Sequence, residues 1–272
     1  MHRGCAGQSR RQFLGLLGVG AAVVLTGCAA PPAATPTAAT STPLSPTPPP
    51  PLPPVPAARA GASKVLFSGP TAGGRIALTV DDGTCADCVT GYADFAVRTG
   101  THLTLSPNGT YAHEWQPHAA ALRPLVAAGQ VQVMNHTFSH RDLRKLPEAQ
   151  VREELERNDE WVVSTFGTTT RPYYRPPFGF HNATVDGIAG GLGYTRSVMW
   201  NGSYSDSETV TPEFLMSEAA KYLKPGVIML GHANHPTVLG LFDQILALIH
   251  DRQLTPVTLD EMFGTSRAVG TA

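Results

Sequence analysis

The chain has 272 residues, of which 42% are hydrophobic and only 15% are charged, and its net charge at neutral pH is −1. A chain without surplus lysine and arginine lacks the charge that neutralises nucleic-acid phosphates, so we expect no nucleic-acid partner. The composition becomes that of a globular protein only from about residue 64 onward.

The first 27 residues have the features of an export signal. Residues 9–14, Ser-Arg-Arg-Gln-Phe-Leu, resemble the twin-arginine signature, and residues 13–25 form an apolar run. This run is shorter than the ~20 residues that a membrane-spanning helix needs. The sequence Leu-Thr-Gly-Cys that ends at Cys28 resembles the bacterial lipobox, in which the cysteine is lipidated and becomes the new N-terminus. We therefore expect an exported protein anchored through Cys28 on the outer face of the bacterial cytoplasmic membrane; an uncleaved anchor is the alternative.

Residues 28–63 are rich in alanine, proline, threonine and serine. Such a segment cannot bury an apolar core, so we expect a disordered linker. At ~3.1 Å per residue it would span roughly 100 Å from the membrane. The folded domain is expected over residues 64–267, with a short tail at residues 268–272.

Seven short runs rich in β-branched or apolar residues are predicted to be strands. They lie at residues 75–80, 101–106, 131–135, 171–174, 194–200, 227–230 and 254–258.

Helical patterns separate most of these strands, at residues 87–100, 114–129, 147–167 and 236–252, with a further helix from Thr211. At that last start, threonine is a good N-cap and the proline that follows suits the first helical position. Strands that alternate with helices predict a parallel sheet. The fold class expected is a single distorted α/β barrel of about seven parallel strands.

The first strand ends in Asp81 and Asp82. Successive side chains on a strand point in opposite directions, so the two carboxylates are expected to have different roles. Further along, His136 and His140 have the i, i+4 spacing that places two side chains on one face of a helical turn. One aspartate and two histidines make a three-ligand metal site with open positions for water and substrate. The other aspartate is then free to act as a base.

Further reactive side chains follow other predicted strands. Arg175 and His232 each lie at or just beyond a predicted strand end, as do Asp81, Asp82 and His136. In a parallel barrel, active sites are built at the carboxyl ends of the strands. The pattern therefore indicates a metal-dependent hydrolase.

Four of these segments together resemble the motifs of the NodB-type polysaccharide deacetylases, carbohydrate esterase family four. The first motif is Thr-Val-Asp-Asp-Gly at residues 79–83, with Val80 in place of the usual phenylalanine. The second, His-Thr-Phe-Ser-His, occupies residues 136–140, and the third, Arg-Pro-Pro-Phe-Gly, occupies residues 175–179. The fifth is Leu-Gly-His at residues 230–232. The resemblance covers nearly the whole globular part.

The fourth motif of the family departs from its usual form. The family has Asp-x-x-Asp-Trp shortly after a tryptophan at a strand end, here Trp200. Ser203 stands where the first aspartate is usual, Asp206 matches the second, and Ser207 replaces the tryptophan. Because this motif helps to set the protonation of the catalytic histidine, Asp206 is the candidate partner for that histidine.

The resemblance implies removal of acetyl groups from a glycan with the help of a divalent cation. Asp82, His136 and His140 would hold the cation, and Asp81 would take the proton from the attacking water. This ligand set suits Zn²⁺, and Co²⁺, Ni²⁺ and Mn²⁺ are alternatives.

The resemblance also assigns roles around the cation. His232 would protonate the departing amine, and Arg175 would hydrogen-bond the base. Leu230 and Trp200 would line the pocket for the acetyl group, and Pro177 would be a further substrate-binding residue.

After the signal is removed and Cys28 is lipidated, Cys85 and Cys88 remain. A lone Cys-x-x-Cys can be a disulfide, a redox pair or half of a zinc site, and no second pair exists to complete a structural zinc site. Outside the membrane a disulfide is favoured.

The expected function is N-deacetylation of an amino-sugar polymer of the cell envelope, such as peptidoglycan, by a monomer. The alternatives are an acetyl esterase that acts on an O-acetylated glycan and a non-catalytic carbohydrate-binding lipoprotein.

Overall fold

The computed structural model describes residues 59–265, and the predictions for the signal, for Cys28, for most of the linker and for the tail lie outside that range. The strands are β1 Lys64–Leu66, β2 Arg75–Asp82, β3 Leu103–Pro107, β4 Val131–Val133, β5 Tyr173–Tyr174, β6 Arg196–Val198, β7 Gly202–Ser203, β8 Ile228–His232 and β9 Thr255–Pro256. The α-helices are α1 Ala86–Thr99, α2 Ala112–Trp115, α3 Ala119–Ala127, α4 Glu148–Phe166, α5 Ala183–Gly191, α6 Pro212–Tyr222, α7 Phe242–Asp251 and α8 Leu259–Phe263. Six 3₁₀ helices complete the described part: η1 Ala72–Gly74, η2 Gly109–Tyr111, η3 Gln116–His118, η4 Leu143–Lys145, η5 Pro177–Gly179 and η6 Pro236–Gly240.

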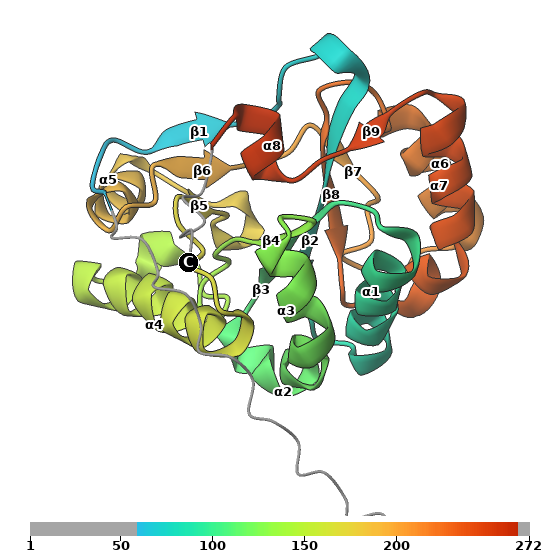
Figure 1. Cartoon of the computed structure of the whole chain (residues 1–272). Helices are drawn as coiled ribbons and strands as arrows, with labels where there is room; N and C mark the ends of the chain where they lie inside the picture. Colours follow the sequence, from blue (N-terminus) through green and yellow to red (C-terminus); the bar gives the residue numbers. More distant parts are fainter. Residues whose placement is uncertain (1–58, 266–272) are drawn as a thin grey trace, which may run out of the picture. The chain divides into compact units, whose positions relative to one another are not determined.

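The strands form two sheets with parallel pairing between all named strands (Figure 1). The larger sheet has the order β4-β3-β2-β8-β7, with β9 paired to β2, and the smaller has the order β1-β6-β5. A single parallel bridge between Asn135 and Tyr174 links the two sheets. This arrangement confirms the predicted distorted α/β barrel.

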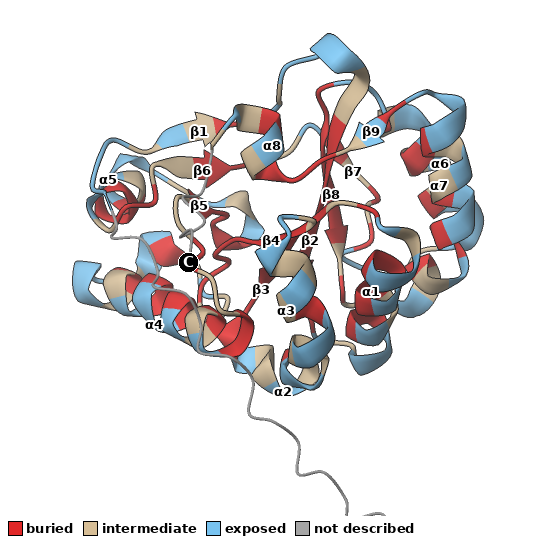
Figure 2. Cartoon of the chain, in the orientation of Figure 1, coloured by how far each residue is buried: buried red, intermediate tan, exposed pale blue. Residues whose placement is uncertain are grey.

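The central strand β2 is buried from Ile76 to its end at Asp82, and β3 and β8 pair with its two edges. Figure 2 shows buried residues concentrated on β2 and β8, whereas the outer faces of the helices are exposed. On both sides of the barrel, helices cover the strands, with α4 and α5 on one side and α6 and α7 on the other (Figure 1).

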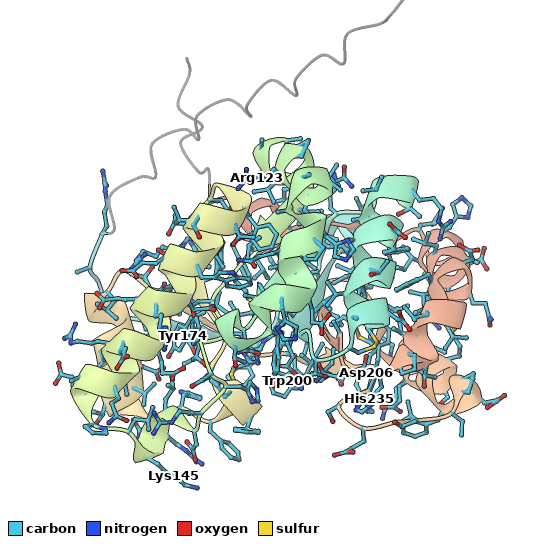
Figure 3. The ribbon with its side chains drawn as sticks, turned by 90° about the horizontal axis from the view of Figure 1, so that it is seen from below. Arg123, Lys145, Tyr174, Trp200, Asp206 and His235 are labelled. Atoms are coloured by element: carbon cyan, nitrogen blue, oxygen red, sulfur yellow. A yellow bond between two sulfur atoms is a disulfide. The ribbon has the colours of Figure 1, made fainter. Side chains whose placement is uncertain are left out.

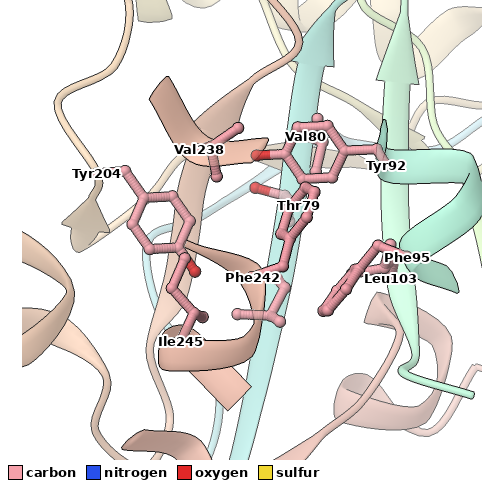
Figure 4. Close-up of a pocket in the computed structure, with 10 residues that line it drawn as sticks. Thr79, Val80, Tyr92, Phe95, Leu103, Tyr204, Val238, Phe242 and Ile245 are labelled. Atoms are coloured by element: carbon pink, nitrogen blue, oxygen red, sulfur yellow. The ribbon is translucent and has the colours of Figure 1, made fainter. Parts of the chain in front are cut away.

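A small apolar pocket lies between β2, α1 and α7 (Figure 4). It is lined by Leu78, Thr79, Val80, Tyr92, Phe95, Leu103, Tyr204, Val238, Phe242 and Ile245. Because none of these side chains is a predicted metal ligand, catalytic residue or substrate contact, we interpret the pocket as imperfect packing of the core.

The predicted starts of two helices can be compared with the residues that cap them in the structure. The Thr211 hydroxyl accepts a hydrogen bond from the Phe214 N–H at 3.2 Å, so the predicted N-cap and first-position proline of α6 are confirmed. Helix α1 begins at Ala86, within one residue of the predicted start at about Asp87, and Cys85 is the N-cap.

Other elements differ from the prediction. The helix expected at residues 114–129 is divided into α2, η3 and α3 around Pro117, which has no N–H to continue the hydrogen-bond ladder. Strands β1 and β7 and helices α5 and α8 were not predicted; each strand has only two or three residues. Within residues 59–265, no helix has the length and hydropathy needed to cross a bilayer.

Candidate active site

The reactive side chains meet at the carboxyl ends of neighbouring strands. Asp81 and Asp82 are the last residues of β2, and the last residue of β8, His232, lies opposite Asp81 in the strand register. His136 follows β4, and Arg175 follows β5. The sheet therefore brings together residues that are up to 151 positions apart, as between Asp81 and His232.

Asp82, His136 and His140 form a three-residue cluster whose ligand atoms lie within 4.8 Å of one another. The Asp82 Oδ1 atom lies 3.4 Å from His136 Nε2 and 3.5 Å from His140 Nε2. Ligand atoms bound tetrahedrally at about 2.1 Å from a zinc ion are about 3.4 Å apart. The spacing of these atoms therefore fits a metal ion.

The hydrogen bonds of the cluster leave the same atoms free to bind a cation. His136 Nδ1 lies 2.8 Å from the Arg175 carbonyl oxygen, which only accepts, so this nitrogen carries the hydrogen and Nε2 keeps its lone pair. The Asp82 Oδ1 atom is buried and accepts no hydrogen bond. A buried carboxylate oxygen without a donor is costly unless a cation binds it.

Without a bound cation, the pKa values of the three ligand side chains differ from their ordinary values. Burial acts to raise the pKa of Asp82, but the interaction with His136 and the charges of the surrounding histidines outweigh burial and hold this pKa well below its ordinary value. Burial acts to lower the pKa of His136, but Asp81 and Asp82 outweigh it, so the pKa is raised. Burial and the charge of His136 lower the pKa of His140 to about 4. Protons therefore compete with a cation for His136 more than for His140.

The prediction that His136 and His140 lie on one face of a helical turn was wrong. The segment between them is a loop, in which Thr137 has φ of 67° and His140 has φ of 55°. Residues other than glycine seldom adopt these left-handed conformations, and strained residues of this kind cluster at active sites and ligand-binding sites. The two histidines converge because the loop is bent.

Buried polar side chains hold this loop in place. The Asn108 amide donates to the carbonyl oxygens of His136 and Thr137, and Asn135 Oδ1 accepts from the Thr137 N–H at 2.8 Å. The Glu154 carboxylate accepts from both the N–H and the hydroxyl of Ser139. These contacts offset the unfavourable backbone conformation, and the motif alone did not reveal them.

The two aspartates have different partners, as predicted. However, their side chains do not point in opposite directions as they would on a regular strand. Asp81 Oδ1 accepts a hydrogen bond from Arg175 Nη1 at 2.8 Å, and Asp81 Oδ2 lies 3.5 Å from His136 Nε2. Asp82 has φ of 71°, which interrupts the regular strand geometry and turns its carboxylate toward the same histidine. Both carboxylates therefore face one site.

Arg175 is almost completely buried, and four hydrogen bonds fix its guanidinium. Its guanidinium donates to the Thr79 hydroxyl and to the carbonyl oxygens of Val198 and Met199, in addition to Asp81. A guanidinium held in this way is a preorganised partner for one carboxylate oxygen.

His232 pairs with Asp206, the candidate from the altered fourth motif. His232 Nδ1 donates to Asp206 Oδ1 at 2.8 Å, and the His232 backbone N–H donates to Asp206 Oδ2 at 3.1 Å. Burial acts to lower the pKa of His232, but the hydrogen bond and charge of Asp206 raise it above the ordinary value. Since Nδ1 is occupied, proton transfer to a substrate must use Nε2.

The predicted substrate contacts lie around this centre. Leu230 is buried two residues before His232 on the same face of β8, and Pro177 is buried in η5. Trp200 is half-buried beside Gly179, with its ring 5.7 Å from the Arg175 guanidinium carbon. In Figure 3, Trp200 and Asp206 lie on the side of the domain opposite Arg123.

Two exposed aromatic rings lie next to the metal cluster. The Phe178 ring lies 4.6 Å from the His140 ring and 57% of the residue is exposed. Phe180, which is 42% exposed, lies 5.5 Å from Phe178, and the Arg144 guanidinium covers one face of its ring at 3.9 Å. Adjacent exposed aromatic side chains commonly mark a ligand-binding surface.

Cys85 and Cys88 form a disulfide at the start of α1, three residues after Asp82. Cys88 is fully buried, and the Cys85 backbone N–H donates to the Ala233 carbonyl oxygen at 3.2 Å. Cross-linking such a short loop removes little entropy from the unfolded chain. The disulfide therefore contributes to local order next to the site more than to overall stability.

Among the residues that sequence analysis left without a role, Asn234 reaches the site and His235 does not. Asn234 Nδ2 donates to Asp82 Oδ2 at 2.7 Å. The His235 ring instead contacts Ser207 and Thr209. The only sequence signal for Asn234 is its place two residues after His232.

Comparisons with known proteins agree with this arrangement. Residues 68–197 match the family model described as polysaccharide deacetylase. A chitin deacetylase of Arthroderma benhamiae is 28% identical over 203 residues, which cover 73% of this chain and 54% of that protein. The chain spans between 47% and 61% of the length of this and two other curated relatives.

Solved structures show the same fold. A peptidoglycan N-acetylglucosamine deacetylase is similar with a TM-score of 0.66 and 23% identity, over 74% of this chain and 94% of that one. A pseudoenzyme of the CE4 family from Bacillus anthracis has a TM-score of 0.65 and 17% identity, over 74% and 69% of the two chains. At these identities the likeness concerns the fold alone.

Proposed function

The chain carries a polysaccharide deacetylase domain of carbohydrate esterase family 4, and from this premise we propose that it is a metal-dependent hydrolase that removes N-acetyl groups from an amino-sugar polymer of the cell envelope, such as peptidoglycan. One observation carries the proposal. The Asp82–His136–His140 cluster lies directly beside a carboxylate paired with a buried arginine, Asp81 with Arg175.

A divalent cation at the cluster would supply Lewis-acid activation of a water molecule and of the acetyl carbonyl. Nitrogen and carboxylate ligands favour Zn²⁺. Asp81 would accept the proton of the attacking water through Oδ2, because Oδ1 is held by Arg175. That oxygen lies on the side of the metal ligands, 3.5 Å from His136 Nε2.

His232 would protonate the nitrogen of the departing amine. An amine is a poor leaving group unless it is protonated, so amide cleavage needs an acid at this position. The Asp206 carboxylate orients the ring through Nδ1 and favours its charged form, which leaves an Nε2 proton to donate.

As the pH is raised, the activity of the Asp206→Asn variant is expected to fall at a lower pH than that of the wild type. Asp206 raises the pKa of His232, and a general acid works only below its pKa, so activity falls as pH rises through that value. The asparagine oxygen can still accept from Nδ1, but it carries no charge. We therefore expect the alkaline limb of the kcat profile to move down by roughly one pH unit or more.

The acidic limb of the same profile serves as the internal control, because it depends on groups other than His232. An alkaline limb that stays at the wild-type pH in Asp206→Asn would contradict the role of Asp206.

The surface beside the cluster supports a glycan substrate. The apolar faces of sugar rings pack on aromatic side chains, and Phe178 and Phe180 offer exposed rings next to His140. The names of the similar proteins, chitin deacetylase and peptidoglycan N-acetylglucosamine deacetylase, support a polymer of N-acetylated sugars.

Acetate and free-amine release from a panel of glycans tests this function. We expect equal amounts of acetate and new amine from peptidoglycan or an N-acetylglucosamine polymer. Acetate from O-acetylated xylan without any new amine would instead support an acetyl esterase. Binding to these glycans without release of acetate would support the non-catalytic alternative.

We also propose that the enzyme is an exported monomer, anchored to the membrane through a lipid on Cys28. The Cys28→Ser variant is then expected to leave the membrane fraction while its specific activity stays unchanged, because the domain begins some 36 residues later at Lys64. Cell fractionation followed by the acetate assay measures both. Retention of the variant in the membrane would mean that residues 13–25 remain as the anchor.

A further inference from the structure

The side chain of Asn234 connects the end of β8 to the turn that carries Asp82. Its Nδ2 atom donates to Asp82 Oδ2 at 2.7 Å. Its Oδ1 atom accepts from the Thr84 N–H at 3.2 Å, from the Thr84 hydroxyl at 3.0 Å and from the Gly83 N–H at 3.4 Å. One amide group therefore contacts both the carboxylate and the backbone that follows it.

This contact makes the two oxygens of Asp82 different. Oδ2 has a hydrogen-bond donor, whereas Oδ1 is buried without one and faces the Nε2 atoms of His136 and His140. We propose that Asn234 is a positioning residue for the metal site: it occupies Oδ2 so that Asp82 binds the cation through Oδ1 alone.

The conformation of Asp82 explains why such a residue is needed. Asp82 has φ of 71°, a region that residues with a side chain seldom adopt. The segment after β8 fixes the backbone on both sides of this residue: the Ala233 N–H donates to the Asp81 carbonyl oxygen at 2.9 Å, and the Ala233 carbonyl oxygen accepts from the Cys85 N–H at 3.2 Å. Asn234 adds the only one of these contacts that reaches the carboxylate.

The inference rests on the proposed metal site but not on the substrate, so zinc affinity is the first measurement. Asn234→Leu has nearly the same size and removes both hydrogen-bonding ends. Loss of a side chain that orients a metal ligand typically costs 10–100-fold in metal affinity, and we expect a loss in this range by competition with a chelator.

Thr84→Val is the matched control. It removes the hydroxyl that bonds to Asn234 but leaves the Thr84 N–H and the contact with Asp82 intact. We expect zinc affinity within about threefold of the wild type, because the carboxylate is still held. A loss equal to that in Asn234→Leu would mean that Asn234 only braces the turn, and would overturn the proposal.

Visible spectra of the Co²⁺-substituted proteins report the coordination directly. With Oδ2 released in Asn234→Leu, both oxygens can bind, so we expect weaker absorption from a higher coordination number, whereas Thr84→Val keeps the wild-type spectrum. If Asn234→Leu does not fold, Asn234→Ser replaces it, since serine is too short to reach Asp82.

Wild-type zinc affinity and an unchanged Co²⁺ spectrum in a folded Asn234 variant would overturn the inference. A wild-type protein that binds zinc tightly but releases no acetate would contradict the proposed function and leave the role of Asn234 standing. Failure of the wild type to bind zinc or Co²⁺ would overturn both.

Discussion

The His136→Ala variant is expected to lose zinc binding and turnover together. In the wild type, the His136 Nε2 atom lies 3.4 Å from Asp82 Oδ1, and removal of this side chain leaves two of the three clustered ligands. Because residues that merely orient a ligand already cost 10–100-fold in affinity, loss of the ligand itself should reduce both affinity and kcat/KM by more than roughly 100-fold. Competition with a chelator and the acetate assay measure the two effects.

Two further variants separate loss of the ligand from loss of the fold. His140→Ala removes the more exposed ligand, and we expect the same two losses with less effect on the core. His102→Ala removes a histidine that pairs with Glu261 at the opposite ends of the strands, and it should bind zinc normally. Folded His136→Ala protein with stoichiometric zinc and normal turnover would show that the ligand assignment is wrong.

The Asp81→Asn variant is expected to keep the metal and lose the chemistry. The amide oxygen can still accept from Arg175, but the side chain can no longer take a proton from water. Loss of a general base typically reduces the rate ~10²–10⁴-fold, and we expect kcat to fall by that amount. Zinc affinity should change far less than in His136→Ala, because Asp82 Oδ1 rather than Asp81 completes the cluster.

Asp159→Asn is the control for removing a charge from a paired, largely buried aspartate. Asp159 pairs with Arg171 and accepts hydrogen bonds from Thr169 and Thr170 rather than from the metal cluster. This variant should therefore unfold at a lower temperature and lose far less of its rate than Asp81→Asn. Wild-type kcat in Asp81→Asn would place the base elsewhere, with His232 as the next candidate.

Much of the fold followed from local sequence patterns. All seven predicted strands are present, because each run is apolar, short and bounded by turn residues, and the ends of α4 and α6 follow from Gly167 and Thr211. Strands β1 and β7 could not be predicted in this way. They have two or three residues each, and their pairing with β6 and β8 depends on contacts between distant segments.

The site shows the same limit at the level of single side chains. The spacing of His136 and His140 identified a pair of imidazoles, but it wrongly suggested a helix. The left-handed Thr137 is stabilised by the neighbouring Asn135 and by Asn108, which follows β3 and is distant in the sequence. The hydrogen bond between Asn234 and Asp82 joins residues 152 positions apart, so no local sequence pattern could predict it.

The central claim is tested most directly by acetate release from an N-acetylglucosamine polymer before and after removal of the metal. We expect the purified protein to release acetate and an equal amount of free amine, to stop after a chelator has removed its cation, and to recover when Zn²⁺ is added back. Asp81→Asn should stay nearly inactive throughout. Release at an undiminished rate by the metal-free protein, or no release by the zinc-loaded protein, would contradict the proposal of a metal-dependent deacetylase.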